Sequence, residues 1–517
     1  MKPRMQPTIK TVKMHAQAVI TFVFTLFVAC LCFPSTALED VADANLKLVF
    51  AHFMIGITSN RHSTADYTSD ILLAKSFGID AFALNIGLDP YTDTQIDLAY
   101  AAASQNSFKV FISFDFNWYH VSQVSDIARK IAKYAHQPSQ LRVDNQAFVS
   151  SFAGDGLDVN ALRAQVRAYG GGEIYFAPNI HPGQANFGVV DGALNWMAWR
   201  NNGNNKAPSP GGRVVTVDEG DRQYHGVLGG KGYIAPLAPW FSTHFGGEVP
   251  YSKNWVFPSD LLIYLRWVDI LSMQPQPSFV EMITWNDYGE SHYLGPLKSK
   301  HMDDGASKWA YGMPHTGWLA LSQPFIAAFK SNSPVLIPAH ITSEKLVYWY
   351  RVHPKSINCD GTDNTIAPAS NASGNFFHGK PNGYDTMQDN VFVVALLKTP
   401  GTVQINSGGT LYVVDVPAGA SAIQVPFKVG PQHFEVVGRQ GMSATSLRLI
   451  KNECPCGIYS FNAYVGVVPA GERDELDADG LLKLGRQCEG LPSAPPQAIQ
   501  PTVTVQAGTI ETGRGRV

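Results

Sequence analysis

Short apolar runs of strand length alternate with helical patterns over roughly the first 330 residues of the chain. The runs that we predict as strands are Lys47–Met54, Ile79–Gly87, Lys109–Asp115, Phe148–Phe152, Glu173–Pro178, Ala193–Trp199, Tyr233–Leu237 and Val280–Trp285. Strands that alternate with helices at a spacing of about thirty residues form parallel βαβ units. Eight such units predict an α/β domain over residues 45–330, folded as a (β/α)8 TIM barrel.

The segments between these strands mostly carry the apolar stripes of helices. From Val124 to Ala135, apolar residues recur at three and four positions, the periodicity of a helix laid on a sheet. Ser63 and Asp66 have the spacing of a capping box at the start of an earlier helix. The connection from Arg200 to Gly232 is long and rich in Gly, Asn and Pro, so we interpret it as a functional loop or lid rather than a packed element.

From Pro334 onward the pattern changes to short β-rich runs separated by Gly, Pro and Asn. The runs that we predict as strands here are Leu346–Val352, Val391–Leu397, Thr410–Val416 and Phe434–Val437. Regularly spaced short strands with turn signals are typical of antiparallel sheets. We therefore predict a β-sandwich-like accessory domain over residues 334–488. Residues 489–517 are rich in Pro, Ala and Thr without aromatic residues and are predicted to be a disordered tail.

The first 37 residues have the order of a secretory signal. Four basic residues precede an apolar run from Ala16 to Phe33, and small residues follow up to Ala37. The alternative is a retained membrane anchor, because the run nearly reaches the length that spans a bilayer. No second apolar run of that length follows. We predict cleavage after Ala37 and a secreted protein, extracellular or in a cell wall, that is not held in a membrane.

Cleavage at this point would remove two of the six cysteines and leave Cys359, Cys454, Cys456 and Cys488. An even number of cysteines in a secreted chain indicates disulfides. A bond between Cys454 and Cys456 across one proline would be strained, so we predict that each of them joins Cys359 or Cys488. The alternative, a zinc site, lacks the two-residue gap of common zinc knuckles. Asn371 begins an N-glycosylation motif.

The composition excludes nucleic acid as a partner. The net charge is −3, the isoelectric point is near 6.6, and no long block of like charges occurs. Charged residues make up 16%, below the roughly 25% of an average soluble protein, so Ser, Thr, Asn, Gln and Gly must supply much of the polar surface. Such a surface suits neutral polar ligands. We expect a monomer.

Candidate chemistry gathers in the stretch Phe279–Tyr293, where an apolar run changes into Trp-Asn-Asp-Tyr-Gly-Glu-Ser-His. Asp287 and Glu290 are two carboxylates with aromatic neighbours, the minimum set that splits a glycosidic bond. A DxxE sequence alone is also typical of a turn with solvated charges. Other strand ends, however, carry polar or aromatic groups as well, and in barrels these ends meet at one face. The substrate-binding residues that we predict are His52, Asn85, Asn179, Trp199, Trp240, Trp285, Tyr288 and His292.

Four motifs carry a family resemblance: FAHFMIG from Phe50, GIDAFALNIG from Gly78, KVFISFD from Lys109 and ITWNDYGESHY from Ile283. In this order they resemble the fungal α-1,3-glucanase (mutanase) family, glycoside hydrolase family 71. The resemblance covers Leu46 to about Lys330 and continues more loosely through the β-rich region. It implies a secreted enzyme that hydrolyses α-1,3-glucan of fungal cell walls by an inverting mechanism. It places the acid/base pair on Asp287 and Glu290 and a further acidic position on Asp115.

Within this scheme we assign Glu290 as the acid, Asp287 as the base that activates water, and Asp115 as a supporting group. Inversion needs carboxyl groups about 6.5 to 9.5 Å apart, so that a water fits between base and sugar. We expect neither a metal nor a cofactor.

Three alternatives remain open at this point. The first is a glycosidase that acts on another polysaccharide, because fold and carboxylates do not choose the sugar. The second is a carbohydrate-binding or wall-associated protein without activity, which the presence of both Asp287 and Glu290 disfavours. The third is a metal-dependent hydrolase, for which paired histidines at strand ends are missing: only His52 is clearly placed there.

Overall fold

The structure is a computed structural model of the chain, and it describes residues 46–209, 211–246, 253–363, 379–471, 473–474 and 503–506. The expected signal segment, Asn371, Cys488 and most of the expected tail lie outside these residues. The described residues all belong to one compact unit, Val41–Val517. No helix among them is both long and apolar enough to cross a membrane.

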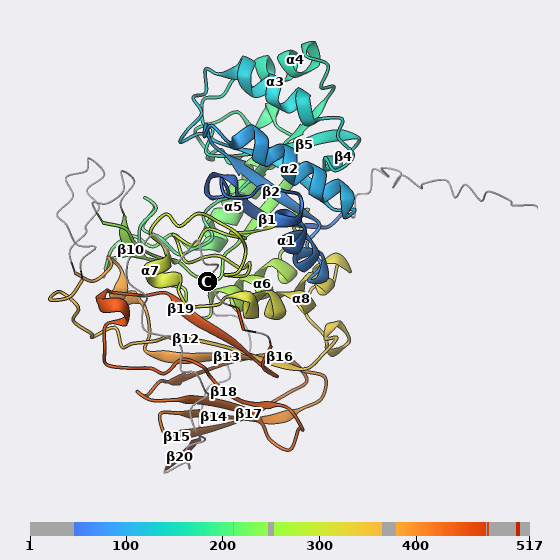
Figure 1. The fold of residues 1–517 in the computed structure, drawn as a ribbon. Helices are drawn as coiled ribbons and strands as arrows, with labels where there is room; N and C mark the ends of the chain where they lie inside the picture. The colour runs from blue at the N-terminus through green and yellow to red at the C-terminus, as the bar shows by residue number, and fades with distance from the viewer. Residues whose placement is uncertain are drawn as a thin grey trace, which may run out of the picture. The chain divides into compact units, whose positions relative to one another are not determined.

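A curled, parallel-rich sheet forms the first part of this unit (Figure 1). Its parallel strands are β1 (Leu48–Met54), β2 (Ala81–Ile86), β3 (Lys109–Asp115), β5 (Gln146–Phe152), β6 (Ile174–Phe176), β7 (Gly192–Leu194), β8 (Gly232–Leu237) and β11 (Phe279–Met282). Ladders join them in the order β7-β8-β11-β1-β2-β3-β5-β6, and the short β4 (Arg142–Val143) pairs antiparallel with β5. The eight predicted strands are therefore present in the predicted places.

Helices occupy most of the connections. They are α1 (Ala65–Ser76), α2 (Thr92–Gln105), α3 (Val124–Tyr134), α4 (Val159–Ala168), α5 (Val217–Leu228), α6 (Leu262–Ser272), α7 (Ser307–Ala310) and α8 (Thr316–Lys330), with the 3₁₀ turns η1 (Ile55–Ile57), η2 (Phe187–Val189), η3 (Pro338–His340), η4 (Tyr384–Thr386) and η5 (Pro455–Gly457). The predicted start of the first helix is confirmed, since the Asp66 carboxylate accepts hydrogen bonds from the backbone N–H groups of His62 and Ser63.

The interpretation of Arg200–Gly232 as an unpacked loop is wrong for its second half, which forms α5. The Thr216 hydroxyl accepts a hydrogen bond from the Glu219 N–H, so it caps the helix start, and Gly229 ends the helix in a left-handed conformation. These are ordinary start and stop signals. The Gly- and Asn-rich residues before Thr216 obscured the helix that follows them.

The inward face of the curled sheet changes from apolar to polar along each strand. The ring centroid of Phe50 lies 5.0 Å from that of Phe111, 5.4 Å from Phe148 and 5.5 Å from Phe279, so four strands fill the interior with aromatic rings. Side chains of a strand alternate between its two faces, so the next inward position on β1 is His52, two residues later. The corresponding next positions on the other three strands are Ser113, Ser150 and Glu281, all buried. Aromatic rings thus fill the interior at the earlier inward positions of the strands, and polar side chains follow toward the carboxyl ends.

Two further sheets form the β-rich region. One has the order β16 (Gly419–Pro426), β13 (Asn390–Leu397), β12 (Lys345–Arg351), β19 (Ala463–Val468); the other has β18 (Ser443–Thr445), β17 (Gln432–Val436), β14 (Gly401–Ser407), β15 (Thr410–Val416), β20 (Val503–Gln506). All pairings are antiparallel except β15 with β20. One hydrophobic cluster contains side chains of both sheets, and the ring of Tyr348 stacks on Phe434 at 3.8 Å. β20 lies within residues 489–517, where the sequence predicted a disordered tail and no strand.

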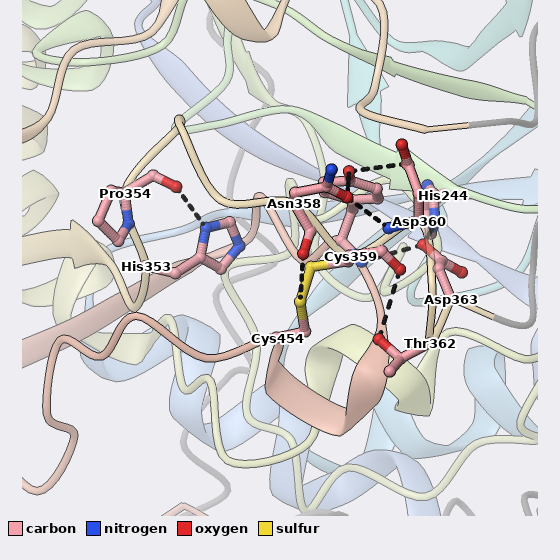
Figure 2. Close-up of a disulfide and its surroundings, with 10 residues drawn as sticks. His244, His353, Pro354, Asn358, Cys359, Asp360, Thr362, Asp363 and Cys454 are labelled. Atoms are coloured by element: carbon pink, nitrogen blue, oxygen red, sulfur yellow. Dashed lines mark hydrogen bonds and ion pairs between the residues drawn. A yellow bond between two sulfur atoms is a disulfide. The ribbon is translucent and has the colours of Figure 1, made fainter.

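A small antiparallel pair, β9 (Ser242–His244) and β10 (Asn254–Val256), lies in the chain between β8 and α6. Neither strand was predicted from the sequence. In the β-rich region, Cys359 and Cys454 form a disulfide, which Figure 2 shows beside His244. This bond agrees with the predicted pairing. Cys456 is disulfide-bonded as well, and its predicted partner, Cys488, lies outside the described residues.

Peptide mapping under non-reducing conditions is expected to recover Cys359 linked to Cys454 and Cys456 linked to Cys488. Since the first bond closes a loop with a sequence separation of 95, replacing both of its cysteines by serine is expected to lower the free energy of unfolding by about 2 to 5 kcal/mol. Thermal unfolding of the variant and the wild type gives the difference. Recovery of Cys359 as a free thiol would contradict the assignment.

Candidate active site

A cavity of about 180 Å³ opens at the carboxyl ends of the parallel strands. It is lined by His52, Met54, Asn85, Asp115, Asn117, Phe152, Trp196, Trp199, Asn205, Phe241, Lys253, Trp255, Asp287 and Glu290. Strands β1, β2, β3 and β5 contribute their last inward positions, and β9 and β10 contribute the opposite wall. The lining combines aromatic faces, amides and carboxylates, which is a suitable set for a sugar ring and its hydroxyls.

The loop after β11 is fastened to the end of β1. The amide of Asn286 accepts a hydrogen bond from the Met54 N–H at 2.7 Å and donates one to the Met54 carbonyl at 3.1 Å. The Trp285 N–H donates to the carbonyl of His52 at 2.7 Å. Only glycine fits at position 289, because a Cβ there would lie 2.9 Å from the ring of Phe245. These contacts fix the backbone on both sides of Asp287.

Asp287 and Glu290 face each other across one turn of this loop. The Glu290 N–H donates to the Asp287 carboxylate at 3.0 Å, and the Asp287 N–H donates to the hydroxyl of Thr284 at 2.9 Å. Oxygen atoms of the two carboxylates lie within 4.8 Å of each other. Neither carboxylate is more than about a fifth exposed. Two partly buried carboxylates at one cavity wall can divide the roles of acid and base.

The Glu290 carboxylate has two partners. Its Oε1 forms an ion pair with the ammonium group of Lys253, and its Oε2 lies 2.7 Å from Nε2 of His292. Burial lowers the pKa of His292 to about 4, so the ring is neutral at neutral pH and donates one N–H to Glu290. Burial also lowers the pKa of Lys253, whereas the charges of Asp287, Asp304 and Asp115 raise it. Lys253 and His292 therefore each hold one oxygen of the Glu290 carboxylate.

Asp115 lies at the end of β3 with 6% of its surface exposed. Burial raises the pKa of its carboxyl, against the opposing effects of the Asn117 N–H and the Asn85 side chain. The Asn117 N–H donates to Oδ1 at 2.9 Å. Asp115 is thus a held carboxyl that faces the cavity, as expected of a supporting group.

His52 is held from below by Glu281. Its Nδ1 lies 2.7 Å from Oε1 of Glu281, and both side chains are completely buried. A proton on Nδ1 leaves Nε2 of the neutral ring as an acceptor, and Nε2 has no hydrogen-bond partner in the described structure. The ring packs edge-on against Trp196 at 4.8 Å. His52 can therefore accept a hydrogen bond from a ligand hydroxyl.

The structure brings six of the eleven predicted site residues together at the cavity: His52, Asn85, Asp115, Trp199, Asp287 and Glu290. His292 stands directly behind them as a partner of Glu290. Asn179 does not reach the cavity, since its amide bonds the Ala153 N–H, the Leu194 carbonyl and the Tyr224 hydroxyl.

Three predicted sugar contacts are instead packed in the interior, which corrects their expected placement. The indole of Trp240 is 1% exposed and donates to the Phe461 carbonyl at 2.9 Å. Trp285 donates to the carboxylate of Asp70 at 3.0 Å. The Tyr288 hydroxyl donates to the Pro296 carbonyl, and its ring stacks on His301 at 4.0 Å. All three have satisfied polar atoms and lie outside the cavity lining.

Sequence reasoning missed the wall formed by β9 and β10, which supplies Phe241, Lys253 and Trp255. It also missed Trp196 and Phe152, which face each other edge-on at 4.7 Å. Phe152 could have been found, because it is the next inward position of β5 after Ser150. Trp255 lies on the short strand β10 and Lys253 immediately before it, where no periodic signal exists, and only their place in the cavity lining with Glu290 reveals them.

Asp287, Glu290 and His292 are also the group of described residues whose spacing fits a metal ion. The ammonium of Lys253 already provides a positive charge at the Glu290 carboxylate.

A carboxylate pair beside aromatic walls, at the carboxyl ends of parallel strands, defines the class of the protein as a glycoside hydrolase. The model of glycosyl hydrolase family 71 matches residues 45–477, and the chain belongs to this family. It is 39% identical to a mutanase of Penicillium rubens over 466 residues, which cover 88% of this chain and 96% of the relative.

A second relative is a glucan endo-1,3-alpha-glucosidase of Schizosaccharomyces pombe, 35% identical over 455 residues that cover 84% of this chain and 97% of the relative. Among solved structures, a GH99 endo-alpha-mannosidase matches with a TM-score of 0.37 and 12% identity, covering 55% of this chain and 98% of that chain.

Proposed function

We propose that the protein is a secreted glucan endo-1,3-α-glucosidase that hydrolyses the α-1,3-glucan of fungal cell walls. The observation that carries this proposal is the Asp287 and Glu290 pair at the cavity wall, in a family whose relatives are mutanases and α-1,3-glucanases. The apolar segment up to Phe33 and the disulfide support secretion. The protein acts as a monomer.

We further propose that the curled sheet is a closed (β/α)8 barrel. No ladder joins β6 to β7, but the Asp191 N–H donates to the Phe176 carbonyl at 3.0 Å and the Leu194 N–H donates to the Pro178 carbonyl at 2.9 Å. The connection between these strands contains the turn η2 in place of a helix. Closure at this point would bring all eight carboxyl ends around the cavity, as in other barrel enzymes.

In the proposed mechanism Glu290 protonates the leaving oxygen and Asp287 activates the attacking water. Glu290 acts in its carboxylic acid form, and Lys253 and His292 hold its carboxyl group at the cavity wall. After the glycosidic bond breaks, Glu290 is again a carboxylate beside Lys253. The water loses one proton to Asp287 as its oxygen bonds to the anomeric carbon. His52 and Asp115 bind hydroxyls of the bound sugar.

Inversion requires the two side chains to diverge when substrate binds. Inverting enzymes place their carboxyl groups about 6.5 to 9.5 Å apart, whereas oxygen atoms of Asp287 and Glu290 lie within 4.8 Å of each other here. Rotation of the Asp287 side chain away from Glu290 would make room for the water. Its Oδ2 is not hydrogen-bonded to His292, because the distance from Oδ2 to the His292 Nε2 is 3.9 Å.

The secreted protein is expected to release short oligosaccharides from insoluble α-1,3-glucan and to leave starch, cellulose and β-1,3-glucan almost untouched. Product sizing over time distinguishes endo from exo action, and NMR of the first product reports the anomer. The β-anomer is the expected first product, because inversion at an α-linkage yields it. Initial α-anomer would contradict the role of Asp287, and equal activity on β-1,3-glucan would contradict the substrate.

A further inference from the structure

The β9 and β10 strands form a wall with two different faces. Lys253, immediately before β10, and Trp255 line the cavity, and residues two apart lie on the same face of a strand. The wall is joined to the catalytic loop by the Ser242 N–H, which donates to the Glu290 carbonyl at 3.0 Å. The position of Lys253 against the Glu290 carboxylate therefore depends on how this wall is held.

The other face of the wall is held by a buried histidine. His244 lies opposite Asn254 in the ladder, and its Nδ1 is 2.7 Å from the Asn254 Oδ1. Its Nε2 is 2.6 Å from Oδ2 of Asp363, which belongs to the β-rich region. The side chains of His244 and Asp363 are 3% and 0% exposed. Each ring nitrogen thus lies within hydrogen-bond distance of a side-chain oxygen, one from the wall itself and one from the β-rich region.

Asp363 is in turn fixed by the disulfide-bonded segment. Its N–H donates to the Cys359 carbonyl at 2.9 Å, and its carboxylate accepts a hydrogen bond from the Tyr459 N–H at 3.1 Å. The bond between Cys359 and Cys454 joins the two stretches of chain that carry these contacts. Figure 2 shows His244 and Asp363 next to this disulfide.

We propose that His244 and Asp363 are positioning residues of the active site, which hold Lys253 in contact with Glu290. The β-rich region thus contributes to catalysis through the wall, although none of its described residues lines the cavity. The inference rests on the role of Glu290 in the proposed function. If His244 and Asp363 only stabilised the fold, their loss would not act on catalysis by way of Lys253. The inference predicts that it does.

The test is a double-mutant cycle with three variants. H244Q/D363N replaces the ring and the carboxylate together, so no buried carboxylate is left without its partner. K253M removes the ammonium group, and the third variant combines all three changes. A small displacement at a reacting group costs about 10²-fold, so we expect H244Q/D363N and K253M each to lower kcat by about 10²-fold with little change in KM. The triple variant should be no slower than K253M alone.

Losses in kcat that multiply in the triple variant, or an H244Q/D363N variant with normal kcat, would overturn the inference. Y264F is the matched control. It removes a hydrogen bond of 3.3 Å from α6 to the Ala420 carbonyl, which also joins the sheet region to the β-rich region, and kcat should not change.

A crystal structure of H244Q/D363N gives a readout that needs no substrate. We expect the ammonium group of Lys253 to lie beyond hydrogen-bond distance of Glu290, with the parallel sheet unchanged. An unchanged contact between Lys253 and Glu290 would refute the inference whatever the enzyme cleaves. A wild-type chain inactive on α-1,3-glucan would instead refute the proposed substrate, and this structural test would still apply.

Discussion

Asp287→Asn and Glu290→Gln are each expected to fold normally and to lose about 10²- to 10⁴-fold in kcat, the usual contribution of a general acid or base. The amides keep the size of the carboxylates but can neither accept nor deliver the proton. Initial rates on soluble α-1,3-gluco-oligosaccharides measure the loss, and circular dichroism verifies the fold. Asp93→Asn, at an exposed aspartate that pairs with Lys130, is the matched control and should keep full activity.

The two variants should differ on a substrate with a good leaving group. An aryl α-glucoside needs little protonation, so it should partly rescue Glu290→Gln and leave Asp287→Asn inactive. Rescue of Asp287→Asn alone would reverse the assignment of acid and base. Restoration of Asp287→Asn by azide, with formation of the β-glucosyl azide, together with release of the α-anomer by the wild type, would show a nucleophile in place of a water-activating base.

Trp240→Ala is expected to lower the free energy of unfolding by about 3 to 5 kcal/mol, the usual cost of emptying a buried tryptophan site. The indole is almost completely buried, lies 6.3 Å from the ring of Trp318 in a stacked arrangement, and bonds the Phe461 carbonyl. Denaturant titration with circular dichroism gives the value. A stable variant that has only lost affinity for glucan would restore Trp240 as a sugar platform.

Trp196→Ala is the matched comparison, because Trp196 is only partly buried and lines the cavity. Its loss should raise KM on α-1,3-gluco-oligosaccharides with a smaller change in stability. The two variants thus distinguish a tryptophan that stabilises the fold from one that contacts the substrate.

The sequence located the parallel strands and the catalytic loop because both depend on local patterns. Apolar runs followed by polar residues mark where a buried strand reaches the end of a sheet, and this rule found His52, Asn85 and Asp115 as well as Asp287. His52, Asn85 and Asp115 lie on the inward faces of their strands, where the period of two residues determines which side chains meet, and Asp287 lies in the loop that follows β11.

The same rule failed where position along a strand did not decide which way a side chain points. Trp240 and Trp285 follow strands, but they turn into the packed interior, where Phe461 and Asp70 accept their indole N–H groups. Both partners are far away in the sequence. Lys253 was missed for the same reason, since its contact with Glu290 depends on a wall whose other face binds Asp363. Contacts of this kind carry no local signal.

The contact between His244 and Asp363 has a consequence for the biosynthesis and folding of the enzyme. Residue 244 and residue 363 are 119 positions apart, and the disulfide that holds the second of them closes only at Cys454. On the ribosome, the strands that carry Asp115 and the loop that carries Glu290 are therefore complete well before their supporting wall can be fastened. Activity should appear late in biosynthesis, after most of the chain has emerged and its thiols have been oxidised. A cell that builds its own wall from the polymer this enzyme degrades would be protected by that order of assembly.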